Sequence, residues 1–203
     1  MNLPEDTKSL TNLVCDRIQG SISLKQILLR SDQFHKLVIQ SALQIVASLR
    51  QGGKVLFFGN GGSAADAQHL AAEFTGRYLK ERRALPALAL HANTSSLTAI
   101  GNDYGFDLVF ARQMEALGRK GDVAVGISTS GNSPNVLRAL QVAREKSIFT
   151  IALTGASGGK MKQVVDCAIC IPSEETPRIQ ECHILAGHII CEIAEDLMVE
   201  AEK

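Results

Sequence analysis

The sequence lacks an excess of charge of either sign, because its 21 basic and 21 acidic residues cancel to a formal net charge of zero at pH 7. Proteins that bind nucleic acid or an anionic membrane usually carry a basic surface, so we expect neither partner. The sequence also lacks an apolar run of the roughly 20 residues that a membrane-spanning helix requires. Its first six residues include Glu5 and Asp6 instead of the basic start of a signal peptide. These absences predict a cytoplasmic protein with small-molecule or protein partners.

A disulfide framework is also missing. The five cysteines are an odd number, and they are scattered through a mid-sized chain, so we expect reduced thiols. Cys167 and Cys170 form a CxxC pair inside an apolar segment, but no second pair lies at zinc-finger spacing. We therefore interpret both as strand residues buried by the fold.

What the sequence does contain is enough apolar material for one domain, with 203 residues of which 45% are hydrophobic. The first fifty residues hold no strand-like segment. Later in that stretch, apolar residues recur at steps of three and four, which predicts an amphipathic helix that starts with Ser31 or Asp32 as its cap and ends at Gly52-Gly53. An earlier helix over about residues 5–29 is expected to be less regular, because Gly20 interrupts it.

From residue 54 onward, short apolar runs alternate with helical stretches. Strands separated by helices need crossover connections, which predicts a parallel sheet covered on both faces. The expected fold class is α/β, a three-layer α/β/α domain with a five-stranded parallel sheet, preceded by an N-terminal helical region. A last helix is expected over about residues 176–199. The five expected strands cover residues 55–58, 87–90, 123–127, 149–153 and 167–171.

Loops that follow the strands are the candidate sites, because ligands of such sheets bind outside the carboxyl ends of the strands. The first loop is Gly59-Asn-Gly-Gly-Ser63, whose glycines allow a sharp turn and a close approach of the backbone to a ligand. Ser63 is expected to cap the alanine-rich helix that follows. His69 and Glu73 lie four residues apart and should project from one face of that helix. An imidazole and a carboxylate so placed could share a metal ion or a substrate.

The loop after the third strand, Ser128-Thr-Ser-Gly-Asn-Ser-Pro134, is rich in hydroxyl side chains. Ser133 is expected at the N-cap and Pro134 at the first helical position. Hydroxyls, backbone N–H groups and a helix N-terminus together suit an anion, most simply a phosphate, although a capped loop without a ligand has the same sequence pattern. The second loop leads through a short helix to Gly101-Asn102-Asp103. The fourth loop, residues 154–159, is interpreted as a flexible turn.

Taken together, these motifs resemble the sugar isomerase (SIS) domain family and, within it, the phosphoheptose isomerases. The resemblance covers nearly the whole chain, and its motifs are specific as a set although each is weak alone. It implies that residues 1–203 form a single SIS domain, with N-terminal helices used for oligomerisation (1–51) and an α/β core (52–203). The residues that carry it are Gly-Asn-Gly-Gly-Ser63 with Gln-His69-x-x-x-Glu73, Gly-Asn-Asp103, Ser-Thr-Ser-Gly-Asn-Ser133 and Arg-Ile-Gln180-Glu-x-His183.

The resemblance implies an aldose-ketose isomerase that converts D-sedoheptulose 7-phosphate to D-glycero-D-manno-heptose 7-phosphate, the first step of ADP- or GDP-heptose synthesis. The reaction passes through an enediol, for which Glu73 would be the base and His188 the acid. A homotetramer is also implied, with one Zn²⁺ per subunit bound by His69, Glu73, Gln180 and His188. The implied substrate-binding residues are Asn60, Gly61, Gly62, Ser63, Glu73, Asn102, Asp103, Ser128, Thr129, Ser130, Ser133 and Gln180.

Two points stay open at the level of sequence. A carboxylate or imidazole bound to Zn²⁺ carries protons poorly, so either the ligands exchange during turnover or zinc mainly organises the site. Gln180 and His188 are eight residues apart, about 12 Å along a helix, which is near the limit for two ligands of one ion. That separation is relieved if Gln180 precedes the helix, or if one ligand comes from a neighbouring chain.

A non-catalytic function is the alternative. Some proteins that resemble these isomerases are binding modules, including a tetrameric adaptor of the bacterial replication initiator, and a sugar-phosphate sensor is a third interpretation. The adaptor branch lacks the carboxylate that corresponds to Glu73 and has a less complete Ser-Thr-Ser loop. This sequence keeps both features, which favours the isomerase.

Overall fold

The computed structural model describes residues 7–200 and begins with two helices, α1 (Thr7–Leu29) and α2 (Asp32–Arg50). Ser31 caps α2, because its hydroxyl accepts a hydrogen bond from the backbone N–H of Phe34 at 3.2 Å, as the sequence predicts. The expected interruption of α1 at Gly20 is wrong. One glycine lowers helix stability by about 1 kcal/mol without ending the helix. The expected start of α1 near residue 5 lies outside the described residues.

A parallel sheet with the strand order β2-β1-β3-β4-β5 forms the centre of the described chain. Every expected strand is found, and its end differs by at most one residue, because hydrophobic runs mark strands better than they mark strand ends. The strands are β1 (Val55–Gly59), β2 (Ala87–Ala89), β3 (Val123–Ser128), β4 (Phe149–Thr154) and β5 (Cys167–Cys170).

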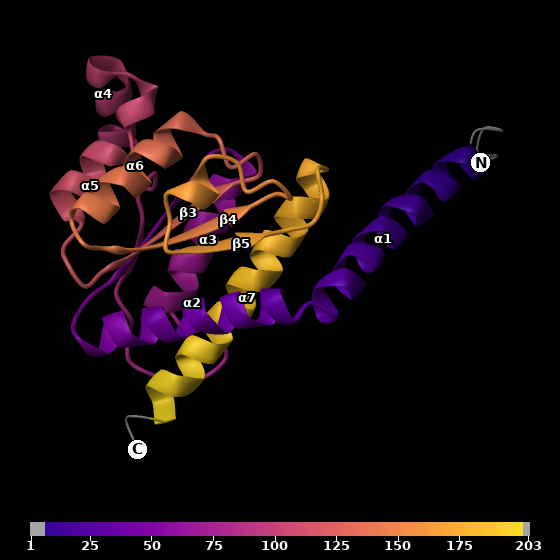
Figure 1. Cartoon of the computed structure of the whole chain (residues 1–203), viewed down its shortest axis with the longest axis horizontal. Coiled ribbons are helices and arrows are strands. Elements are labelled where there is room, and N and C mark those ends of the chain that lie inside the picture. The colour runs from indigo at the N-terminus through magenta and orange to yellow at the C-terminus, as the bar shows by residue number, and fades with distance from the viewer. Residues whose placement is uncertain (1–6, 201–203) are drawn as a thin grey trace, which may run out of the picture.

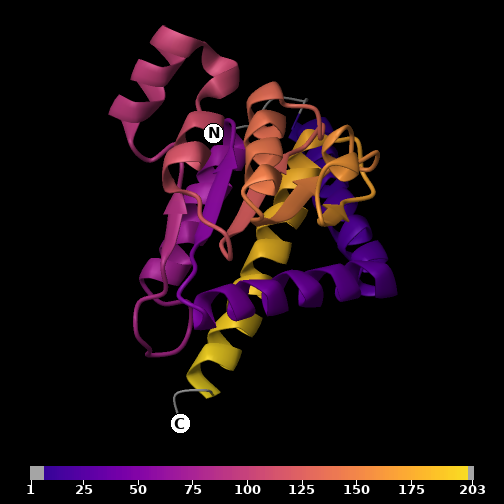
Figure 2. The same cartoon turned by 60° about the vertical axis from the view of Figure 1, so that its left-hand side comes forward.

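Helices cover both faces of the sheet, which confirms the three-layer architecture. On one face lie α2, α3 (Gly62–Thr75) and α7 (Thr176–Glu200), and on the other lie α5 (Ala111–Leu117) and α6 (Pro134–Glu145) (Figures 1 and 2). Side chains of β1 alternate between the two cores, since successive residues of a strand point to opposite faces. The remaining elements are α4 (Thr94–Tyr104) and two 3-10 turns, η1 (Phe106–Leu108) and η2 (Met161–Gln163).

The helix α1 leaves the body of the domain toward its N-terminal end (Figure 1). Its buried residues are Leu24 and Leu28, near the C-terminal end, whereas other apolar side chains, such as Val14 and Ile18, are 57% and 56% exposed. Within residues 7–200, no helix combines the length and apolar character needed to cross a membrane. All five cysteines lie in this described part of the chain and none is in a disulfide, as expected.

Candidate active site and metal centre

The loop after β1 turns sharply at Gly61, which has φ +55° and occupies the N-cap position of α3. Ser63 is therefore not the cap that the sequence predicts, because α3 already begins at Gly62 and buries Ser63 in its first turn. Gly59 must lack a side chain, since a Cβ there would lie 2.8 Å from the carbonyl oxygen of Ser63. The glycines thus bring the start of α3 directly against the end of β1.

An amide pair joins the loops that follow β1 and β3. The Nδ2 group of Asn60 donates to Oδ1 of Asn135 at 2.9 Å, and Asn135 returns an equivalent bond to Oδ1 of Asn60 at 2.9 Å. Asn135 is 2% exposed, and its Oδ1 also accepts from the backbone N–H of Val136. The sequence pattern did not single out Asn135, although its place just after the hydroxyl-rich loop was a usable signal. The pair holds the two loops together at the carboxyl edge of the sheet.

Three serine hydroxyls of the loop after β3, residues 128–134, converge. The Oγ atom of Ser128 lies 2.8 Å from Oγ of Ser133 and 3.4 Å from Oγ of Ser130. Ser133 occupies the N-cap position of α6 and Pro134 follows it, as predicted, but the hydroxyl of Ser133 bonds to Ser128 and not to the helix backbone. The loop therefore gathers hydroxyl groups at the N-terminus of α6, which suits an anion.

The loop after β4 supports this serine loop and is more than a turn. The backbone N–H of Gly155 donates to the carbonyl of Thr129 at 2.9 Å, and that of Met161 donates to the carbonyl of Gly131 at 3.0 Å. Gly131 has φ +64°, and a Cβ there would lie 2.2 Å from the carbonyl oxygen of Gly158. Two glycine-rich backbones therefore pack face to face behind the serine hydroxyls.

Asn102 and Asp103 lie in α4, where the amide of Asn102 donates to the carboxylate of Asp103 at 2.8 Å. Both side chains are exposed, and no residue of α4 is buried. Asp103 lines a groove of about 530 Å³ between α4 and α5, together with Tyr104 and Arg112. The structure therefore places this expected pair on the periphery of the chain (Figure 1).

A compact group of metal-ligating side chains forms where α3 and α7 run side by side. The Nε2 atom of His69 lies 3.1 Å from Oε1 of Glu73 and 2.9 Å from Nε2 of His188. One candidate ligand atom from each residue lies within 4.8 Å of the other two. Two imidazole nitrogens and a carboxylate oxygen are a donor set that Zn²⁺ accepts, with room for a further ligand. Three of the four expected zinc ligands thus meet within one chain.

The group is open to solvent on one side and covered on the other. The side chains of His69 and Glu73 are 50% and 19% exposed, and the ring of Tyr78 packs on His188 with the centroids 5.6 Å apart. Burial lowers the pKa of His188, the neighbouring His69 lowers it further, and Glu73 opposes both effects. His188 is therefore a neutral imidazole near pH 7, able to bind a metal or to donate one hydrogen bond.

Close contact between α3 and α7 depends on Gly187. A Cβ at this position would lie 2.6 Å from both terminal methyl carbons of Leu70, a side chain that is 1% exposed. Since Leu70 follows His69 and Gly187 precedes His188, the absence of a side chain at 187 sets the distance between the two histidines. The sequence alone did not mark Gly187.

Gln180, the fourth expected ligand, lies in α7, which already begins at Thr176. The alternative in which Gln180 precedes the helix is therefore wrong. Its amide lies over the start of α3, because a Cβ on Gly62 would be 2.5 Å from Nε2 of Gln180. The chain thus places Gln180 beside the first glycine loop, about 12 Å along α7 from His188, and its role as a ligand stays a prediction.

The His69, Glu73 and His188 group and the serine loop lie at different levels of the sheet. Hydrogen bonds from Leu85 to Phe74 and from Val55 to Pro86 tie the end of α3 to the first residue of β1, at the amino edge. The serine loop follows the last residue of β3, at the carboxyl edge. Along the axis of α3, His69 and Glu73 lie roughly 10 and 16 Å from Gly62 at the start of the helix. The serine loop leads into α6, which covers the opposite face of the sheet.

His183 is a fully buried residue of the same helix. Its Nε2 lies 3.0 Å from the carbonyl oxygen of Thr154 and donates to it, which leaves Nδ1 without a hydrogen-bond partner among the described residues. Burial lowers the pKa of His183 to about 4, against the opposing effect of the hydrogen bond with Thr154. His183 is thus a neutral core histidine, consistent with the usual role of a lone histidine on a helix.

Comparison with known proteins gives one consistent result. The SIS domain family matches residues 23–155. A phosphoheptose isomerase of Rhodospirillum rubrum is 61% identical over 161 residues, which are 79% of this chain and 86% of that protein. A phosphoheptose isomerase of Roseiflexus sp. is 50% identical over 200 residues, which are 98% of this chain and 100% of that protein.

A solved structure agrees with the sequence matches. The phosphoheptose isomerase GmhA from Neisseria gonorrhoeae is 47% identical and has a TM-score of 0.87, with 92% of this chain and 99% of that chain covered. The similarity therefore extends over the sheet, the glycine and serine loops, and both helices that carry the His69, Glu73 and His188 group.

Proposed function

The chain belongs to the SIS domain family and, within it, to the phosphoheptose isomerases, and from this premise we propose that it interconverts D-sedoheptulose 7-phosphate and D-glycero-D-manno-heptose 7-phosphate. As a member of that family it is a sugar-phosphate isomerase of heptose biosynthesis. The observation that carries the more specific proposal is the cluster of His69, Glu73 and His188, which supplies a base and a hydrogen-bond donor in one accessible place. The cytoplasmic location expected from the sequence remains a prediction.

Isomerisation needs one group that takes a proton from carbon and another that serves the carbonyl oxygen. In this proposal the Glu73 carboxylate removes a proton from C1 of the ketose while His188 gives its proton to the carbonyl oxygen at C2, which forms the enediol. Glu73 then returns its proton to C2, and the hydroxyl at C1 gives its proton back to His188 as the aldose carbonyl forms. A neutral imidazole is sufficient for that role, which agrees with the lowered pKa of His188.

The serine loop is the proposed phosphate site. The hydroxyls of Ser128, Ser130 and Ser133 converge at the N-terminus of α6, where backbone N–H groups and the helix dipole favour a dianion. Thr129 and the Asn60–Asn135 pair fix the backbone around these hydroxyls. This support makes the bound phosphate, rather than an empty capped loop, the better interpretation.

The donor set of His69, Glu73 and His188 fits Zn²⁺, and the resemblance of the chain to the phosphoheptose isomerases implies the same ion. Bound there, zinc would supply a Lewis acid next to the carbonyl and hydroxyl oxygens of the sugar. Removal of metal from purified protein with a chelator is expected to lower turnover, and about one Zn²⁺ per chain should restore it. Full activity of metal-free protein would contradict the proposal.

We also propose that a second copy of the chain completes each site. The serine loop and the Glu73 group of one chain are separated along α3 and lie toward opposite edges of the sheet, so one sugar phosphate would reach both more easily across an interface. The exposed apolar side chains of α1, such as Val14 and Ile18, support assembly through the N-terminal helices. A tetramer is expected.

Mixing two inactive variants tests this assembly. Because Glu73 and His188 already meet within one chain, the informative pair is Glu73→Gln and Ser130→Asp, whose new carboxylate repels the phosphate. Co-refolded mixtures should regain part of the activity if each site combines two chains. No recovery despite proven subunit exchange would assign both groups of a site to one chain.

The decisive experiment on function is turnover of sedoheptulose 7-phosphate by the purified protein and by Glu73→Gln. Loss of a general base commonly costs about 10²- to 10⁴-fold in rate, and Glu73→Gln should retain the circular dichroism of the wild type. Glu81→Gln is the matched control, because Glu81 is 89% exposed and follows the same helix. A folded wild type without turnover would support the alternative of a non-catalytic binding module.

A further inference from the structure

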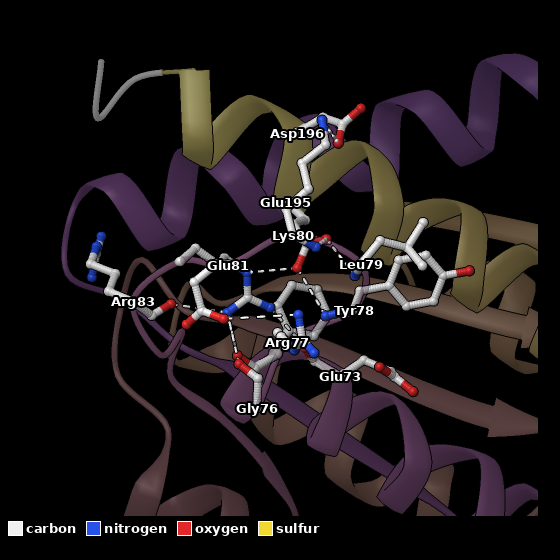
Figure 3. Close-up of polar contacts among 12 residues, drawn as sticks. Glu73, Gly76, Arg77, Tyr78, Leu79, Lys80, Glu81, Arg83, Glu195 and Asp196 are labelled. Atoms are coloured by element: carbon white, nitrogen blue, oxygen red, sulfur yellow. Dashed lines mark hydrogen bonds and ion pairs between the residues drawn. The ribbon is translucent and has the colours of Figure 1, made fainter.

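A buried ion pair lies beneath the irregular segment 76–84, which forms most of the connection between α3 and β2. Arg82 of the segment and Glu195 of α7 are 3.0 Å apart, and their side chains are 2% and 1% exposed. The Glu195 carboxylate also accepts the backbone N–H groups of Tyr78, Leu79 and Lys80 at 2.7 to 2.8 Å. Figure 3 shows Tyr78, Leu79 and Lys80 gathered around it.

Four hydrogen-bond donors therefore surround a single carboxylate. Burial by itself would raise the pKa of Glu195, but the bonds from Leu79, Tyr78 and Lys80 and the charge of Arg82 hold it below its ordinary value. Glu195 is thus ionised, and it fixes the backbone of three consecutive residues in one conformation.

The guanidinium of Arg82 binds the end of α3 at the same time. Its Nη2 group donates to the carbonyl of Glu73 at 2.8 Å, and its Nη1 group donates to the carbonyls of Phe74 and Gly76 at 3.0 and 3.2 Å. The last carbonyls of a helix have no partner inside the helix, and helix ends fray where nothing replaces that partner. Arg82 therefore closes the turn of α3 that carries Glu73.

Both ends of this network touch the candidate active site. Glu73 lies two residues before the end of α3 at Thr75, so loosening of that turn would move its carboxylate away from His69. Tyr78, whose N–H is bound by Glu195, packs its ring on His188. The ion pair thus acts on two sides of the His69, Glu73 and His188 group.

We propose that Arg82 and Glu195 are positioning residues of the isomerase, which lock the last turn of α3 and the segment 76–84 so that the Glu73 carboxylate and the Tyr78 ring stay fixed around His188. The inference rests on the proposed function, in which Glu73 and His188 act on the sugar. Stability alone explains the pair poorly, since apolar residues often replace a buried ion pair without loss. A guanidinium that spans several carbonyls specifies geometry, which apolar residues cannot do.

A second ion pair provides a matched control. Lys80 and Asp196 lie 2.7 Å apart and join the same segment to the same helix, but their side chains are 50% and 44% exposed and bind each other instead of the carbonyls of α3. Figure 3 shows Lys80 reaching toward Asp196, on the side of Glu195 away from Glu73. Asp196→Asn therefore removes a tie between segment and helix without loosening the turn that carries Glu73.

The test compares Arg82→Lys with Asp196→Asn and the wild type. Arg82→Lys keeps a charge next to Glu195 and loses the planar fork that binds the carbonyls. Mutation of residues that orient metal ligands typically lowers metal affinity or activity by about 10- to 100-fold. We therefore expect the Zn²⁺ affinity of Arg82→Lys, measured without substrate by competition with a chromophoric chelator, to fall by about that factor. We also expect kcat to fall by a similar factor, while KM for sedoheptulose 7-phosphate stays within about threefold because the serine loop is untouched. Asp196→Asn should match the wild type in all three quantities.

The outcomes separate this inference from the proposed function. A folded Arg82→Lys variant with wild-type Zn²⁺ affinity and kcat, next to an inactive Glu73→Gln, would overturn the positioning role and leave the isomerase intact. A wild type that neither turns over substrate nor binds Zn²⁺ would overturn both. If Arg82→Lys does not fold, Tyr78→Ala decides, because Tyr78 is only half-buried. At least tenfold weaker Zn²⁺ binding in Tyr78→Ala, but not in Tyr78→Phe, supports the inference, and wild-type binding in both contradicts it.

Discussion

Gly187→Ala is the sharpest perturbation of the contact that forms the His69, Glu73 and His188 group. The new Cβ would lie 2.6 Å from two methyl carbons of Leu70, whereas carbon atoms in contact prefer about 3.5 to 4.0 Å. Either the helices α3 and α7 separate by about 1 Å, or Leu70 leaves its rotamer. Overpacking of this kind costs about 1 to 3 kcal/mol in the free energy of unfolding.

Metal binding should report the same displacement more sensitively. Metal–ligand distances tolerate changes of only about 0.2 Å, so a shift of α7 that carries His188 away from His69 should weaken the binding of Zn²⁺. Leu70→Ala removes the clashing carbons and by itself costs about 2 to 5 kcal/mol through the cavity it leaves. In the double variant the methyl group of residue 187 occupies part of that cavity, and the zinc affinity should recover.

Urea unfolding and zinc titration of the four proteins in this cycle measure both effects. We expect the sum of the two single-variant losses in unfolding free energy to exceed the loss in the double variant by about 0.5 to 3 kcal/mol, the range found for residues in contact. Gly20→Ala is the matched control, because a Cβ there meets nothing within 4 Å and should stabilise the helix by about 0.4 to 1 kcal/mol. Additive costs, or wild-type zinc binding by Gly187→Ala, would refute the argument.

Three further predictions follow from the same structure. Because the pKa of His183 falls to about 4 in the fold and is about 6.5 in the unfolded chain, its neutral form stabilises the fold fully above pH 6.5. About 3 kcal/mol of this contribution to the free energy of unfolding is lost as the pH drops to 4. Urea unfolding at several pH values should therefore show less loss of stability in acid for His183→Gln than for the wild type. Asn135→Ala breaks the buried pair with Asn60 and should cost about 1 to 3 kcal/mol in unfolding free energy, measured in urea, with a raised KM; an unchanged midpoint would contradict the role of the pair. Ser130→Ala should raise KM for the sugar phosphate with kcat nearly unchanged, because it removes a donor to a group outside the reacting bond, and a fall in kcat alone in steady-state kinetics would count against the phosphate site.

Most of the fold was predictable from the sequence, because the signals that specify it are local. Largely apolar runs of four or five residues marked every strand, and Ser31 and Pro134 marked the starts of α2 and α6. The errors are also local in origin. Gly20 did not interrupt α1, since one glycine costs a helix only about 1 kcal/mol, and Ser63 did not cap α3, since Gly61 takes the N-cap position two residues earlier.

The candidate site was predictable only in part. The glycine and serine loops follow strands whose order sets their proximity, so the motifs were enough to locate them. Asn135 and Tyr78 carry no motif of their own, and their roles depend on partners that are distant in the sequence, Asn60 and His188. The interpretation of residues 154–159 as a simple turn failed for the same reason, because the loop is fixed by bonds to the serine loop and not by its own sequence.

The sequence by itself determined the α/β class, the strand positions and the pairing of His69 with Glu73, which follow from periodicity, turn residues and helical spacing. The family resemblance rests instead on its set of motifs. The resemblance implied that His188 joins that pair, and the tertiary structure brings the three side chains together. Only the tertiary structure decided that Gln180 lies beside Gly62 and that Arg82 and Glu195 close the turn that carries Glu73. The physical reason is that these contacts depend on how closely α7 packs against α3. That distance is set by the absence of one side chain at Gly187 and by the burial of one ion pair, neither of which leaves a periodic signal in the sequence.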